Sequence, residues 1–176
     1  MEIRIRQENA NDYAKVSELI EAAFRDLEYS DHREHFLVER LRKSDAFILE
    51  LSLVAEVEDE IVGHILLTKL LIENGNESFE SLALAPVSVK PEFQGRGIGS
   101  RLITESHVIS KKLGYKSVIL LGHENYYPRF GYEPTSKYGI TMPFDAPEEN
   151  CMIISLTENG LLAISGEVKY PKEFFG

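Results

Sequence analysis

Three glycines at alternate positions, Gly95, Gly97 and Gly99, mark the segment 91–100, PEFQGRGIGS. Glycine has no Cβ, so it takes a positive φ readily and lets the backbone come close to a ligand. The segment lies between an apolar run and a stretch with helical spacing. Main-chain NH groups at the start of a helix, together with the positive end of the helix dipole, attract anions. We therefore predict that this loop binds phosphate groups.

Two common phosphate-binding patterns do not fit the loop. The Rossmann pattern needs a glycine at its sixth position, and counting from Gly95 that position is Ser100. The Walker pattern needs Gly-Lys followed by Ser or Thr, which does not occur here. A mononucleotide-binding α/β protein is therefore a weak alternative. A turn that only joins a strand to a helix would need one glycine and not three.

Polar residues follow the next apolar run, 116–123. His123 and Glu124 stand beyond its end, where α/β sheets hold ligands, so either could relay a proton as a general base. Both could equally be solvated loop residues. Glu80, at the start of the preceding strand, is a weaker candidate, and an ordered water could serve instead. No set of His, Asp and Glu has the spacing of metal ligands, so we expect no metal site.

The hydrophobic periodicity predicts one α/β domain over residues 1–176, in which 150–176 is a docked C-terminal strand and tail. A helix over 9–24, with Asn11 or Asp12 as its cap, and a second over 35–44 follow a first strand. Further strands and one further helix are expected in the order 47–57, 61–72, 81–89, helix 98–113, 116–123 and 151–156. The acidic residues 58–60 indicate a hairpin.

Pro86 interrupts the strand expected over 81–89. Proline has no NH to donate to a ladder, so we expect a bulge or a splayed edge there. The strand, the following helix and the strand at 116–123 form a βαβ unit over 82–122, which predicts that the two strands are parallel.

Charge and cysteine content limit the function classes. The 19 basic and 29 acidic residues give a net charge of -10, which disfavours nucleic acid and anionic membranes as partners. No run approaches the ~20 apolar residues of a membrane span. Cys151 is the only cysteine, so no internal disulfide can form, and we interpret it as a core residue. We expect a cytoplasmic protein.

The pattern Q-x-x-G-x-G, formed by Gln94, Gly97 and Gly99 after the strand APVSVKPEF, resembles the GCN5-related N-acetyltransferase (GNAT) family. The segment YYPRFGY is similar to the family's Tyr-x-x-x-Gly-aromatic segment, and the order of elements also agrees. The resemblance covers the whole chain and is most specific between 82 and 132. It extends to a subgroup of predicted bacterial acetyltransferases of unassigned substrate. It implies an α/β (α+β) GNAT fold, with a mixed central sheet that has a splayed parallel strand pair and is flanked by helices.

The resemblance also implies roles for individual residues. Acetyl-CoA would be the co-substrate, and an amine would attack its thioester directly in a ternary complex. Tyr127 would protonate the departing sulfur, although it could instead be only a packed aromatic. The main chain of Val87 and Val89 would bind the pantetheine arm, and Arg96 could add a contact to phosphate. The pyrophosphate would be held by the amides of Gln94, Gly95, Arg96, Gly97, Ile98, Gly99 and Ser100.

Two questions stay open at this point. The chain could be an acyl-CoA sensor or regulatory module that binds the coenzyme without catalysis, although Tyr127 favours an enzyme. The acceptor amine is unassigned, and we expect the loop 25–34, the hairpin and the segment YYPRF to grip it. The apolar tail with Tyr170, Phe174 and Phe175 could cover its own core or the surface of a second copy, which leaves a homodimer open.

Overall fold

The alternating residues near the N-terminus form β1 (Arg4–Gln7), which pairs antiparallel with β2 (Phe47–Val57) in a computed structural model that describes residues 1–176. β2 pairs antiparallel with β3 (Glu60–Asn74). The turn between them has Glu58 at φ 50° and Asp59 at φ 64°, the left-handed conformation of a tight hairpin. The hairpin predicted at the acidic residues is therefore confirmed.

Helices α1 (Tyr13–Phe24) and α2 (Glu34–Arg42) follow the predicted amphipathic pattern. Asp12 occupies the N-cap position of α1, as predicted, but its side chain makes no capping hydrogen bond to that helix. A 3-10 turn, η1 (Ala10–Asp12), precedes α1, and its cap is Asn9, whose side chain accepts from Asn11 N at 2.9 Å. The Asp12 carboxylate in turn accepts from Asn9 N at 2.8 Å, which completes a capping box one turn earlier than expected.

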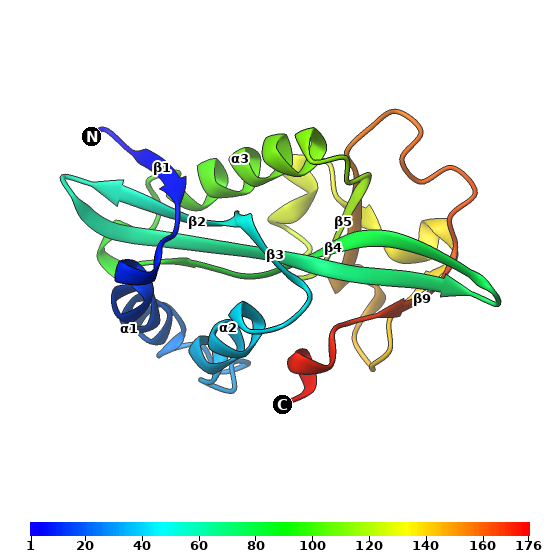
Figure 1. Ribbon diagram of the computed structural model, residues 1–176, viewed down its shortest axis with the longest axis horizontal. Helices are drawn as coiled ribbons and strands as arrows, with labels where there is room; N and C mark the ends of the chain where they lie inside the picture. Colours follow the sequence, from blue (N-terminus) through cyan, green and yellow to red (C-terminus); the bar gives the residue numbers. More distant parts are fainter. The chain divides into compact units, whose positions relative to one another are not determined.

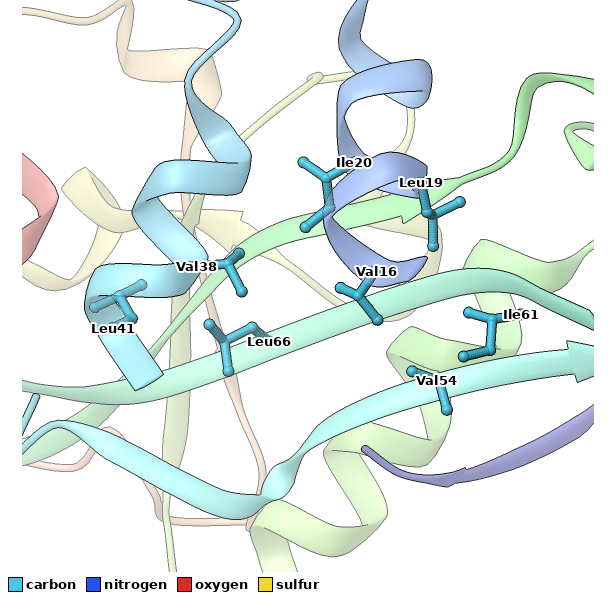
Figure 2. Packing of buried hydrophobic residues seen from close by; sticks show 8 residues of the cluster. All are labelled: Val16, Leu19, Ile20, Val38, Leu41, Val54, Ile61 and Leu66. Carbon is cyan, nitrogen blue, oxygen red and sulfur yellow. The ribbon is translucent and has the colours of Figure 1, made fainter. Parts of the chain in front are cut away.

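The core of this region lies between the two helices and the sheet. Figure 1 shows α1 and α2 on one face of β2 and β3, and the first turns of α3 (Ile98–Lys112) on the other. In Figure 2 the apolar side chains of α1 and α2 point toward those of β2 and β3. The cluster consists of Val16, Leu19, Ile20, Val38, Leu41, Val54, Ile61 and Leu66. Burial of large aliphatic side chains stabilises a fold by about 1.5–3 kcal/mol each.

β4 (Glu77–Val89), α3 and β5 (Ser117–Leu121) form the predicted βαβ unit. β4 and β5 are parallel, with Leu82 opposite Val118 and Ala83 opposite Ile119. These pairs precede Pro86, whose peptide bond with Ala85 is cis. The splaying of the two strands beyond this point stays a prediction.

The C-terminal third adds short strands. β8 (Cys151–Ser155) pairs antiparallel with β5 and with β6 (Glu133–Pro134). β9 (Gly166–Lys169) pairs antiparallel with β3 and parallel with β7 (Ile140–Thr141). The chain ends in the 3-10 turn η6 (Lys172–Phe175), where Phe174 packs against the cluster of α1 and α2.

The strands are joined in the order β1-β2-β3-β4-β5-β8-β6, which gives a mixed central sheet with three α-helices. By its internal packing the chain divides into two units. The first comprises residues 1–68, 85–109 and 172–176, and the second comprises 69–84 and 110–171. The single domain expected over 1–176 stays a prediction. None of the helices is long and apolar enough to cross a membrane.

Candidate functional site

The glycine loop, residues 94–100, belongs to the first unit and is held at its entry by two hydrogen bonds. Lys90 N donates to Val62 O of β3 over 2.8 Å, directly after β4 ends. A 3-10 turn, η2 (Pro91–Phe93), then leads into the loop. The side-chain amide of Gln94 donates to Val89 O over 3.1 Å. Gln94 thus ties the start of the loop to the end of the strand.

Two glycines of the loop have backbone conformations that other residues seldom adopt. The φ angle is 76° at Gly95 and 82° at Gly97. A Cβ built at either position would meet no atom within 4 Å beyond its chain neighbours. The backbone conformation therefore requires glycine here, while crowding inside the protein does not. Because the adjacent space is open, a ligand can reach the peptide groups directly.

α3 begins immediately after Gly97. Arg101 N donates to Gly97 O over 3.1 Å. The amides of Ile98, Gly99 and Ser100 therefore lie in the first turn, where no helical carbonyl precedes them. They stand at the positive end of the helix dipole, which favours an anion at this position. The open conformation of the glycines and the amides of the first turn of α3 together form a site that suits phosphate oxygens.

The position of this helix start depends on Gly63 in β3. A Cβ at Gly63 would lie 3.0 Å from the side chains of both Ile98 and Leu102. Both of these side chains are fully buried, with exposures of 1% and 0%. A larger residue at position 63 would push the start of α3 away from the sheet and displace the loop.

The other residues predicted to bind the coenzyme flank the loop in the same unit. Val87 and Val89 are half-buried and alternate with buried Ser88, so they share one face of β4. Arg96 is exposed, and its Cζ lies 5.2 Å from the ring centroid of Phe93. The side chain of Arg96 thus stays at the loop and supplies a positive charge there.

Tyr127 belongs to the second unit, where it begins the 3-10 turn η3 (Tyr127–Phe130). The main-chain NH groups of Tyr126 and Tyr127 donate to His123 O over 3.1 and 3.4 Å. This tight turn brings the Tyr127 ring back over the end of β5. A Cβ at Gly122 would lie 2.4 Å from Cε2 of that ring, so the ring packs directly on the glycine backbone.

Three further aromatic rings surround Tyr127. Its ring centroid lies 5.1 Å from Tyr126 and 5.7 Å from Tyr132, both edge to face. Phe130 is 6.4 Å away and tilted. Burial raises the pKa of Tyr132 well above its usual value, and the charge of Tyr127 raises it further. Tyr132 therefore stays neutral and acts as a packing partner, while half-buried Tyr127 keeps access to solvent.

The two predicted bases adjoin Tyr127 in sequence, and hydrogen bonds already engage both. His123 Nδ1 accepts from Asn125 N over 3.3 Å, so the neutral ring carries its proton on Nε2. The Glu124 carboxylate is exposed, and Asn150 Nδ2 donates to it over 2.8 Å. Its own backbone amide and then Asn150 lower the pKa of Glu124, which weakens it as a base.

Asn150 and Gly122 form the backbone contact beneath the Tyr127 ring, and the sequence did not reveal either residue. Gly122 N donates to Asn150 O over 2.9 Å, and Asn150 Nδ2 donates to Gly122 O over 3.0 Å. A glycine directly after a buried strand was a usable signal for Gly122. Asn150 is distant in sequence, and no local pattern pointed to it.

Cys151 and Glu80 belong neither to the glycine loop nor to the group of residues around Tyr127. Cys151 is 5% exposed, and burial raises the pKa of its thiol, with the nearby Glu148 and Glu149 adding to the effect. A neutral, buried thiol is a poor nucleophile. Glu80 is exposed on β4. No group of His, Cys, Asp and Glu side chains is arranged to hold a metal ion.

Comparison with known proteins identifies relatives over most of the chain. Residues 4–135 match the model of the acetyltransferase (GNAT) domain. The uncharacterized N-acetyltransferase YjhQ of Escherichia coli strain K12 is 33% identical over 161 residues, which cover 90% of this chain and 88% of that protein. The uncharacterized N-acetyltransferase YhbS of the same strain is 28% identical over 147 residues, covering 83% of this chain and 86% of YhbS.

Solved structures with the same architecture were also found. A GNAT family acetyltransferase from Brucella melitensis, crystallised in complex with acetyl-CoA, has a TM-score of 0.80 and 32% identity, with 98% of each chain covered. YhbS from Escherichia coli, in complex with CoA, has a TM-score of 0.87 and 24% identity, covering 99% of this chain and 92% of that chain. The GNAT-like order of strands and helices predicted from the sequence is therefore confirmed.

Proposed function

The chain belongs to the GNAT family of acetyltransferases, and we propose that its glycine loop binds the diphosphate of acetyl-CoA while Tyr127 assists the transfer of the acetyl group. The protein is an N-acetyltransferase that uses acetyl-CoA as co-substrate. The acceptor is an amine. We also propose the roles given below for single residues, a cytoplasmic location and the possibility of a homodimer. The identity of the amine is taken up in the next subsection.

The loop geometry carries this proposal. Gly95 and Gly97 have positive φ and open space where a side chain would stand, next to the first turn of α3. A diphosphate needs several NH donors at short range, and the amides from Gly95 to Ser100 would supply them without reorganisation of the helix. The Gln94 amide donates to Pro91 O over 3.3 Å and would have to leave that bond to contribute. Arg96 adds a charge-assisted contact, and the main chain of half-buried Val87 and Val89 would bind the pantetheine arm.

Acetyl-CoA supplies a thioester whose carbonyl carbon the amine attacks, so that a C–N bond forms as the C–S bond breaks. The Tyr127 phenol donates its proton to the departing sulfur. An amine of pKa ~10.4 must first lose a proton, and a simple thiolate has a pKa of ~8.5, so both proton transfers need help. His123, Glu124 or water would receive the proton of the amine. The His123 imidazole must release its bond with Asn125 N to act through Nδ1.

A thiol-release assay tests the function directly. The protein is mixed with acetyl-CoA and a panel of amines that includes amino acids, polyamines, aminoglycosides and lysine peptides. Amine-dependent release of CoA thiol, with an equal amount of acetylated amine found by mass spectrometry, supports transfer. Binding of acetyl-CoA without thiol release from any member would instead indicate an acyl-CoA sensor.

A further inference from the structure

A cavity of about 640 Å³ in the first unit is lined by residues outside the glycine loop and outside the group around Tyr127. It is bounded by the connection between α1 and α2, by α2 itself and by residues 174–176 at the end of the chain. The residues that matter for the argument are Tyr29, Asp31, Arg33, Glu34, Arg40 and Phe175. Its size suits a small molecule of the dimensions of an amino acid or a short peptide.

The charged groups around this cavity do not neutralise one another. The Arg33 guanidinium contacts the Phe36 ring, with Cζ 5.7 Å from its centroid, and it forms no ion pair. Arg40 Nε donates to Glu173 O over 3.1 Å, a bond that leaves its two terminal nitrogens for other acceptors. Neither guanidinium group has a carboxylate partner, so both can bind an anionic group of a ligand.

The two carboxylates of the cavity bind neutral groups. Asp31 Oδ1 accepts from Arg33 N over 2.9 Å, and Glu34 Oε2 accepts from Ser30 Oγ over 2.5 Å. Neither carboxylate forms an ion pair within the cavity. The cavity thus has two guanidinium groups and two carboxylates that form no ion pairs with one another. Such a lining is complementary to a ligand that carries both a positive and a negative group.

Aromatic side chains complete the lining. Tyr29 is 84% exposed and Phe175 is 64% exposed, so both rings are accessible to a ligand. Phe174, beside Phe175, is fixed against the core cluster, so the end of the chain is held at the cavity. The rings give the ligand an apolar wall between the charged groups.

We propose that this cavity holds a zwitterionic acceptor, an amino acid or short peptide with a large apolar or aromatic side chain. This inference rests on the proposed function, because it assigns the substrate class of the same enzyme. Arg33 and Arg40 bind the carboxylate, for which the planar guanidinium is well suited. Asp31 and Glu34 attract the ammonium group, and Tyr29 with Phe175 contact the side chain. Polyamines and aminoglycosides, which have no carboxylate, lack the group that the arginines bind.

The test compares L-phenylalanine with L-phenylalaninamide, and L-leucine with L-leucinamide, which differ only in the carboxylate. Affinity for the full chain is measured by titration calorimetry, and acetylation by mass spectrometry. We expect each acid to bind at least about tenfold more tightly than its amide. Arg33→Gln should remove this preference while leaving the affinity for acetyl-CoA unchanged. Lys43→Gln, which removes the same charge from a position next to α2 that does not line the cavity, should leave the preference intact.

The outcomes separate this inference from the proposed function. Equal binding of acids and amides, no binding of any amino acid or dipeptide, or an unchanged preference in Arg33→Gln would overturn the zwitterion site. Loss of acetyl-CoA binding or of thiol release with every amine would count against the proposed function instead. Preferential acetylation of a polyamine would keep the enzyme and discard the substrate class.

Discussion

The ring of Tyr127 lies on the backbone of Gly122, so close that a Cβ at position 122 would stand 2.4 Å from Cε2 and 2.8 Å from Cδ2 of the ring. Gly122 is in turn bonded to Asn150, the residue before β8, through both its NH and its carbonyl group. The pairing of β5 with β8 therefore sets the height of the Tyr127 ring above the strand end. A catalytic phenol would gain its position from this contact.

Gly122→Ala should displace the Tyr127 ring. We expect a loss of stability of about 1–3 kcal/mol from overpacking, and a fall in kcat with little change in acetyl-CoA affinity. Thermal unfolding and thiol release measure the two effects. Leu121→Ala, at the exposed neighbouring position, is the control and should change neither. Full turnover at unchanged stability in Gly122→Ala would show that the ring is not held there.

Tyr127→Phe removes the phenol hydroxyl and keeps the ring. Because general acid catalysis contributes about 10²–10⁴-fold, we expect kcat to fall by about 10²-fold or more with an unchanged melting temperature. Tyr126→Phe, at the adjacent ring 5.1 Å away, is the matched control and should retain most of its activity. Equal rates for the wild-type protein and Tyr127→Phe would remove Tyr127 from the mechanism.

Glu8 forms a buried ion pair that should matter far more for stability than a surface pair. Its carboxylate is 2% exposed and accepts from Arg42 Nη2 at 2.6 Å, and Ser52 Oγ donates to it at 2.7 Å. Glu8→Ala leaves the Arg42 guanidinium largely buried without an anionic partner, with only the Tyr13 ring beside it, so we expect a loss of about 3–5 kcal/mol in urea unfolding. Glu60→Ala breaks the exposed pair with Lys90 and should cost about 1 kcal/mol or less. Similar losses in the free energy of unfolding of Glu8→Ala and Glu60→Ala would refute the prediction that the buried pair contributes more to stability.

The pH dependence of stability should reflect buried His64. Burial lowers the pKa of His64 from 6.5 to about 4, partly offset by the charge of Glu8. In the unfolded chain His64 becomes protonated below pH 6.5, whereas in the folded chain it stays neutral down to about pH 4. The free energy of unfolding therefore falls as the pH drops from 6.5 to about 4. For His64 alone the change approaches about 3 kcal/mol. Burial lowers the pKa of His107 to about 4 as well, which adds in the same direction.

Urea unfolding at a series of pH values between 4.5 and 7.5 checks this prediction. His64→Gln removes the titrating group, so its stability should change less with pH than that of the wild-type protein. A parallel pH dependence in both proteins would mean that His64 does not titrate as described.

Much of this fold could be predicted because local patterns and packing agree. Strong periodicity marked α1, α2, β2 and β3, and the glycines at 95 and 97 proved to have the positive φ that their spacing suggested. Asp12 takes the predicted N-cap position of α1, but its side chain instead completes the capping box of the preceding 3-10 turn, whose cap is Asn9. The sequence did not show this turn because Asn9, Asn11 and Asp12 are all good cap residues. The short strands β6, β7 and β9 have too few residues to show a period.

The parts of the site that lie within one continuous segment could be predicted from the sequence. The parts that depend on contacts between residues far apart in the sequence could not. The glycine loop is one continuous segment, so its spacing was sufficient. Gly63 positions α3 through side chains of Ile98 and Leu102, and Asn150 supports Gly122 across 28 residues of sequence. The cavity around Arg33 and Arg40 includes residues 174–176, which no local pattern joins to α2.

Calorimetric titration of acetyl-CoA into Gly97→Val and Gly75→Val tests the central proposal most directly. Both glycines have positive φ, at 82° and 61°, and open space at the Cβ position, so both substitutions place a branched side chain in an unfavourable backbone conformation without a clash. Only position 97 adjoins the start of α3. The account predicts that both variants fold, that Gly97→Val loses at least about tenfold in affinity, and that Gly75→Val binds like the wild-type protein. Undiminished affinity in a folded Gly97→Val variant would contradict it.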